Sequence, residues 1–202
     1  MTKSDPFVKR DGRRRKQNAG SLRSFSLILF SLPLFFANTA HGDIDTDLLE
    51  AAKTGNTAMV ERLLEQGADA NAETEKGTTA LMWAASESHT ATVNALISAG
   101  ADANASTEDG WTAMMDAAVF GRTETVMAFI DADVDVNAKQ KDGKTVLMWA
   151  VERSQTENVK VLIDAGADTN AETEDGKTAL MIAAGEGHTE IVDILRQAGA
   201  SR

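Results

Sequence analysis

The stretch GTTALMWAA at residues 77–85 decides the fold, because the chain contains three near-copies of it. The copies are GWTAMMDAA from Gly110, GKTVLMWAV from Gly143 and GKTALMIAA from Gly176, so the period is 33 residues. A period of 20–50 residues held over most of a chain predicts an array of stacked structural repeats. Two further columns keep the same spacing: Asn71, Asn104, Asn137 and Asn170, and Val60, Val93, Val126, Val159 and Val192.

Each copy carries the signals of a helix pair. A threonine precedes an apolar run, where its hydroxyl can cap the exposed amides of a first helix. Val93, Leu96 and Ile97 then give a second helix its apolar face, and Gly100 follows as the left-handed residue that ends it. Asp133 takes that glycine position in one repeat, which an aspartate tolerates. The predicted N-caps are Thr46, Thr79, Thr112, Thr145 and Thr178.

These phrases resemble those of the ankyrin repeat. Its Thr-Pro-Leu-His phrase appears as TALM (79–82), TAMM (112–115), TVLM (145–148) and TALM (178–181), with Ala or Val for Pro and Met for His. The Ala-Ala pair, the Gly-His corner at 187–188 and GADANA at 67–72 and 100–105 also match. The resemblance covers residues 44–200 and implies an all-α solenoid of stacked helix–turn–helix units with projecting β-turn loops. It says little about function, because one fold serves many.

The repeat sets the expected domain organisation. We expect one ankyrin-repeat domain over 43–202, with terminal units that present polar faces and keep the array soluble. Asp45, Asp47 and Glu50 make the first helix polar, and Arg196 stands where earlier repeats have isoleucine. The expected units are 43–73 as the N-terminal cap, 74–106, 107–139, 140–172, and 173–202 as the C-terminal cap.

Residues 1–42 have the composition of a secretory signal peptide. They hold eight Lys or Arg against two acids, and the uncharged FSLILFSLPLFFA follows at 25–37. As a helix those 13 residues reach about 20 Å, too short for a bilayer core of about 30 Å. Small residues then offer cleavage after Gly42 or Ala40. We therefore expect a Sec-type signal and a periplasmic or secreted protein, with an uncleaved signal anchor as the alternative.

The remaining residues are strongly acidic. Of the 20 basic and 31 acidic residues, 43–202 retain 12 and 29, a net charge of −17. Such a surface repels phosphate backbones and anionic membranes, so nucleic acid and, after signal cleavage, membrane are excluded as partners. A protein with a neutral or basic surface is the expected partner, and the chain is expected to be monomeric. The absence of cysteine leaves no disulfide or thiolate metal site.

The sequence offers no catalytic machinery. It contains no recognisable nucleophile–base pair and no phosphate-binding glycine loop, so we expect no enzyme activity, no catalytic residues and no cofactor. The methionine column at 82, 115, 148 and 181 is better explained as flexible core filling than as a soft-metal ladder. The acidic turns lack the alternating carboxylates of a calcium loop, and no metal site is expected.

Partner recognition is expected from the residues that break the period. The resemblance implies that partners bind the concave side, formed by the turn tips and first helices. Trp111 and Phe120 are aromatic in columns otherwise polar, which is typical of binding hot spots. Trp83 and Trp149 share a column with Asp116, either beside this groove or packed between repeats, and Arg153 can stack on Trp149. The candidate partner-binding residues are Trp111, Phe120, Trp83, Asp116, Trp149, Arg153, Glu87, Glu108, Asp109 and Lys144.

Together these features predict a non-enzymatic protein–protein interaction module in an exported compartment, with its partner on the concave face. Two alternatives remain open at this level. One is an accessory factor that supports or protects an exported redox or stress-defence enzyme. The other is a membrane-tethered structural scaffold that keeps residues 1–42.

Overall fold

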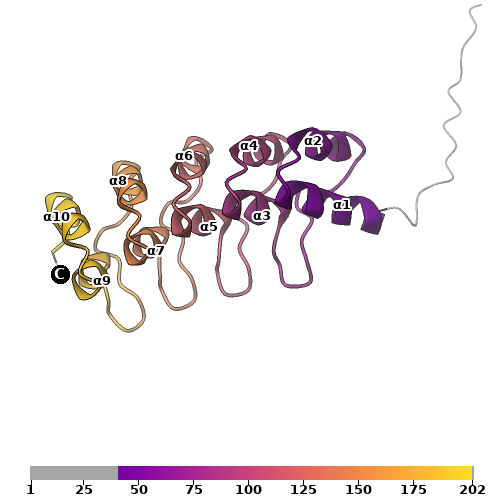
Figure 1. The fold of residues 1–202 in the computed structure, drawn as a ribbon. Coiled ribbons are helices and arrows are strands. Elements are labelled where there is room, and N and C mark those ends of the chain that lie inside the picture. The colour runs from indigo at the N-terminus through magenta and orange to yellow at the C-terminus, as the bar shows by residue number, and fades with distance from the viewer. Residues whose placement is uncertain (1–40, 202) are drawn as a thin grey trace, which may run out of the picture. The chain divides into compact units, whose positions relative to one another are not determined.

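The computed structural model describes residues 41–201, so the predicted signal segment lies outside the described residues except for its last two positions. Within 41–201 the chain forms ten helices and no strands, arranged as five consecutive pairs (Figure 1). The pairs are α1 (His41–Lys53) with α2 (Thr57–Glu65), α3 (Ala80–Ser86) with α4 (Thr90–Ser98), α5 (Ala113–Val119) with α6 (Thr123–Asp131), α7 (Val146–Glu152) with α8 (Thr156–Asp164), and α9 (Ala179–Gly185) with α10 (Thr189–Gln197).

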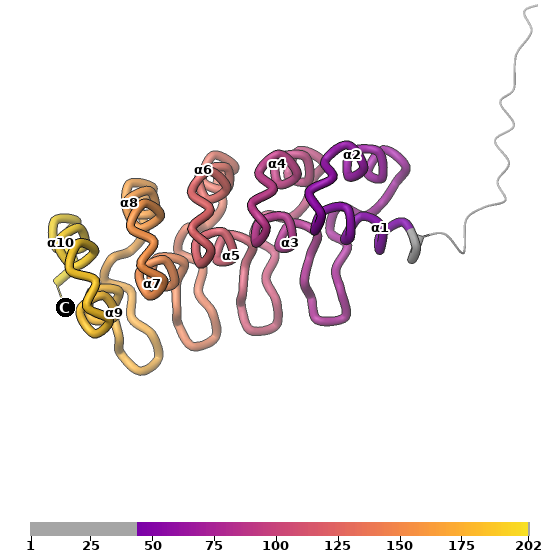
Figure 2. Tube along the Cα trace, viewed as in Figure 1, coloured from indigo at the N-terminus to yellow at the C-terminus, as the bar shows by residue number. Residues whose placement is uncertain are grey.

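The helices stack in two rows, and long loops project from one of them. The first helices of the pairs form one row and the second helices form the other, each packing on its equivalent in the next pair (Figure 2). Three of the loops close with an isolated antiparallel bridge, such as that between Glu73 and Thr79. The predicted all-α solenoid with projecting turns is therefore confirmed. Among these helices, none has the length and apolar character needed to cross a membrane.

Threonine caps begin four of the five first helices. Thr79, Thr112, Thr145 and Thr178 each accept a hydrogen bond at Oγ1 from the backbone N–H three residues later, at 3.3 Å. The same prediction at Thr46 was wrong, because α1 begins at His41 and Thr46 lies inside it. In the other repeats a loop ends at the threonine and the helix begins there. In the described residues no loop precedes Thr46, and α1 begins before it, at His41.

The periodic apolar residues build one continuous core. Val93, Val126 and Val159 are fully buried at equivalent places in successive second helices. The methionine column is buried in the same way until the last repeat, where Met181 is 44% exposed because no further layer covers it. Val192 is only half-buried for the same reason. Each layer thus buries the apolar face of its neighbour, as expected of a solenoid.

The asparagine column links each repeat to the next. In every case the side-chain carbonyl accepts a hydrogen bond from a backbone N–H 31 residues later. These bonds run from Asp102 to Asn71 (2.7 Å), from Asp135 to Asn104 (3.0 Å), from Asp168 to Asn137 (2.8 Å) and from Ser201 to Asn170 (3.0 Å). The asparagines are therefore repeated because they satisfy backbone groups between layers, which leaves them occupied in the fold.

The projecting loops pack closely in the second half of the array. Gly110 has a φ of +82°, and a Cβ built there would lie 2.9 Å from both the Gln140 Cα and the Lys139 carbonyl oxygen of the following loop. Gly77 has a similar φ of +74°, but the nearest atom to its Cβ would be 3.8 Å away. Both positions need a left-handed residue, and Gly110 also needs the space.

We expect Gly110→Ala to destabilise the protein more than Gly77→Ala. Both variants meet the left-handed backbone penalty of about 1–2 kcal/mol. Gly110→Ala must also separate two backbones, which adds about 1–3 kcal/mol. Urea denaturation of both variants measures the difference, and equal losses would show that the close packing of the loops is not required.

Candidate partner-binding groove

A groove of about 440 Å³ lies between the first helices α3 and α5 and the loops that precede them. Five of the ten predicted partner-binding residues line it: Trp83, Glu87, Trp111, Asp116 and Phe120. They come from two successive repeats and from three different columns of the alignment. The groove therefore joins residues that break the period, on the row of helices that carries the projecting loops.

Two aromatic residues of the groove differ in how firmly they are held. Trp111 is half-buried against the core, and its ring meets that of Trp149 edge to face, with 5.0 Å between centroids and 69° between planes. It therefore forms a wall of the groove and also joins two repeats. Phe120 caps the C-terminal end of α5 and is 53% exposed. Phe120 thus offers apolar surface that the fold leaves uncovered.

Asp116 lies half-buried in α5 beside these rings. Burial raises the pKa of Asp116 to about 6, and a hydrogen bond from the Trp111 indole offsets part of that rise. Within residues 41–201 its carboxylate has no Lys, Arg or His nitrogen within 4.0 Å. A charged group removed from water without a counter-ion lowers the stability of the fold. The position of Asp116 is therefore not explained by stability.

Arg122 is a groove residue that the sequence reasoning missed. It precedes α6, lines the groove, and has a buried Nε without a hydrogen-bond partner. Its column otherwise holds Asn, His or Gln, and two of those side chains bond back to the preceding first helix. His89 Nε2 lies 3.2 Å from the Lys53 carbonyl, and Gln155 Nε2 donates to the Val119 carbonyl at 3.3 Å. In the sequence, Arg122 could have been recognised as a candidate because it is the arginine in a column that otherwise holds Asn, His or Gln.

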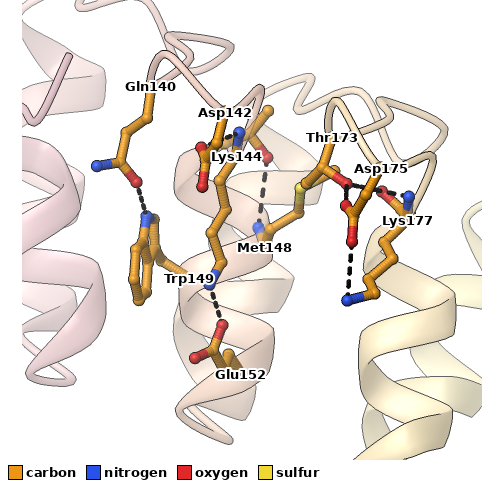
Figure 3. Close-up of polar contacts among 10 residues, drawn as sticks. Gln140, Asp142, Lys144, Met148, Trp149, Glu152, Thr173, Asp175 and Lys177 are labelled. Carbon is orange, nitrogen blue, oxygen red and sulfur yellow. Dashed lines mark hydrogen bonds and ion pairs between the residues drawn. The ribbon is translucent and has the colours of Figure 1, made fainter. Parts of the chain in front are cut away.

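Trp149 and Lys144 are occupied by contacts within the chain (Figure 3). The Lys144 ammonium lies 3.6 Å from the centroid of Trp149 and forms an ion pair with Glu152. The Trp149 Nε1–H donates to Gln140 Oε1 at 2.6 Å. The idea that Arg153 stacks on Trp149 was therefore wrong. Lys144 reaches the indole from the loop before α7, and its ion pair with Glu152 of α7 holds the ammonium group there. Arg153 is exposed at the end of α7.

The remaining two predicted residues lie elsewhere. Glu108 and Asp109 are exposed at a loop tip and line a separate gap of about 530 Å³ between the first two loops. Asp109 also lies 3.8 Å from Lys141, an exposed pair of little energetic weight. The structure therefore does not bring these acids to the groove. In the described part of the chain, no three His, Asp or Glu side chains converge as a metal site.

A second groove, between α7 and α9, makes a useful contrast. It measures about 550 Å³, and its charged residues include two lysines that have partners within the chain. Lys144 pairs with Glu152, and Lys177 pairs with Asp175 at 2.9 Å (Figure 3). A hydrogen bond from Thr173 and the contact with Lys177 lower the pKa of Asp175. Both lysines of this groove are thus paired with a carboxylate, whereas Asp116 has no ion pair within residues 41–201 and the Nε of Arg122 has no partner.

We expect Asp116→Asn to stabilise the protein at neutral pH. The folded-state pKa of Asp116 is raised, so the wild type keeps the full stability of the protonated form below about pH 4 and loses it as pH rises through about 6. The neutral amide avoids this loss, and the gap should grow from near zero at pH 4 to about 1–3 kcal/mol at pH 7.

Urea denaturation at both pH values measures that gap. The exposed Asp131→Asn variant corrects for the removal of one negative charge. A gap of the same size at pH 4 and pH 7 would contradict the burial of an uncompensated carboxylate at Asp116.

Comparison with known proteins supports the architecture. The family described as "Ankyrin repeats (3 copies)" matches residues 48–140 and 124–201, which together cover most of the chain. A search of curated proteins gave no match. The matched ranges contain every residue that lines the groove and every repeat from α3 onward. The chain therefore belongs to the ankyrin-repeat family.

Proposed function

We propose that the protein is an exported, non-enzymatic binding module, and that the groove between α3 and α5 holds a segment of a protein partner. Ankyrin repeats are protein–protein interaction modules. The observation that carries the proposal is the exposed Phe120 beside the uncompensated Asp116. A central aromatic with polar surroundings is the usual composition of a binding hot spot. A residue that lowers the stability of the fold and forms no compensating contact indicates a functional role.

The charge of the array supports a partner with a basic or neutral contact surface. Residues 43–202 carry a net charge of −17, which attracts basic proteins over long distances and accelerates their association. The same charge disfavours nucleic acid and anionic lipid. The protein is proposed to act as a monomer that presents one groove to one partner.

Export of the protein is proposed from residues 1–42, and the mass of the mature protein tests it. Intact-mass spectrometry of the protein from its host's envelope or medium should show a chain that starts at Asp43 or His41. Export signals of this composition are removed after small residues. A chain that retains residues 1–42 in the membrane fraction would instead support a tethered protein.

A photo-crosslinker at the groove tests partner binding directly. We expect p-benzoylphenylalanine at position 120 to give a discrete adduct with one partner protein in living host cells. The same replacement of Met127 serves as the matched control, because Met127 is 49% exposed but lies on α6 outside this groove. Both sites accept a large apolar side chain at the surface, so folding should be equal.

Comparison of the two positions distinguishes specific binding in the groove from non-specific crosslinking at an exposed surface. An adduct from position 120 that is absent from position 127 supports the proposal, and immunoblotting against the protein detects it as a shifted band. Equal adducts from both positions, or none from position 120, would remove the groove between α3 and α5 as the binding surface.

A further inference from the structure

We infer that the partner anchors itself by a lysine or arginine side chain, whose cationic head pairs with Asp116 while its aliphatic stem lies along Trp111. This inference rests on the proposed function and specifies the chemistry of the groove. Long basic side chains suit such a site, because their stems cover apolar surface while the charged head reaches a polar group.

The first support is the unpaired carboxylate itself. The Asp116 carboxylate lines the groove together with the Trp111 indole, and within residues 41–201 it has no ion pair. A carboxylate has room for several further donors. A cation placed there gains more than one at the exposed loop acids, because solvent screens a half-buried group less. The Asp116 carboxylate can therefore accept a cation from a partner.

The second support is that the chain itself pairs a lysine with an indole and a carboxylate at a neighbouring place. In the next repeat, the Lys144 ammonium lies over Trp149 and pairs with Glu152, and only 15% of the Lys144 side chain is exposed (Figure 3). In the groove the columns hold other residues: Trp111 stands in the column of Lys144 and Asp116 in that of Trp149, so an indole and a carboxylate lie together without a lysine. A partner side chain would supply it.

Trp83 shows that an indole on the groove wall accepts a lysine as well. The Lys53 ammonium lies 4.8 Å from the centroid of Trp83. Lys53 is not among the residues that line the groove, so it leaves the groove itself open. Cations bind over tryptophan rings more favourably than over other aromatic rings. All three tryptophans thus lie where a cation is bound or can be bound.

The other charged groups near the groove define the competing possibility. Glu87, at the end of α3, adds a second acid, whereas Arg122, before α6, adds a cation. On the side of α7, Lys144 and Glu152 neutralise each other. Arg122 could recruit an acidic side chain instead, because its Nε has no partner. Peptides of opposite charge distinguish the two.

Four capped pentapeptides test the inference, identical except for a central lysine, arginine, norleucine or glutamate. Each is titrated into the ¹⁵N-labelled full-length protein at pH 7 while NMR follows the three indole N–H signals. We expect the lysine and arginine peptides to shift the Trp111 signal and to bind about tenfold more tightly than norleucine, the uncharged analogue of lysine. Asp116→Asn should remove that tenfold preference, and Asp131→Asn should keep it.

Acidification provides an independent readout. With the pKa of Asp116 at about 6, about nine-tenths of the carboxylate is ionised at pH 7 and about one-tenth at pH 5. Because the uncharged form should bind about tenfold more weakly, binding of the lysine peptide should weaken about fivefold from pH 7 to pH 5 in the wild type. The Asp116→Asn variant should show no such loss.

Several results would overturn the inference. They are equal binding of the lysine and norleucine peptides, tighter binding of the glutamate peptide, no binding of any peptide, or an unchanged preference in Asp116→Asn. A crosslink from position 120 together with any of these results would leave the proposed function standing and remove only the basic anchor. Loss of both would remove the groove as a binding site.

Discussion

The structure depends on one constraint: no helix pair of this chain can bury its own apolar face. Valines 93, 126 and 159 and methionines 82, 115 and 148 are buried, whereas Met181 in the last layer is 44% exposed. The asparagine column then satisfies backbone groups from layer to layer. Such shared burial requires the same side chains at the same places, so the period of 33 residues is a packing requirement. Residues outside these columns are free to differ.

The residues that break the period fall into two groups, which differ in how much they lower the stability of the fold. Asp133 replaces a glycine and tolerates the left-handed backbone, with a φ of 58°. Lys144 and Glu152 neutralise each other over Trp149. Asp116 and Arg122, by contrast, lie in the groove between α3 and α5 with a raised pKa and an unpartnered nitrogen. The groove between α3 and α5 thus holds two such groups, which is why it supports a binding function better than the second groove does.

The fold followed from the sequence because repeated copies of one signal reinforce each other. Threonine caps, the left-handed Asp133 and half of the candidate site were predicted by position in the repeat. Side-chain pairing could not be predicted that way. Lys144 and Arg153 both lie within reach of Trp149 along the sequence, and the approach of the loop decides for Lys144. The unpartnered Arg122 is likewise a three-dimensional property: His89 and Gln155 in its column contact a carbonyl, whereas the Nε2 of His188 has no partner. The prediction at Thr46 was wrong because α1 begins at His41, so this threonine does not follow a loop as the other four caps do.

The central claim is that periodic residues build the stack and the residues that interrupt them in one groove recognise a partner. Hydrogen–deuterium exchange of the protein, with and without the partner identified at the groove, tests it most directly. We expect added protection in residues 78–87 and 107–122, with little change along the second helices α4 and α6. Protection confined to the second helices, with the groove segments unchanged, would contradict it.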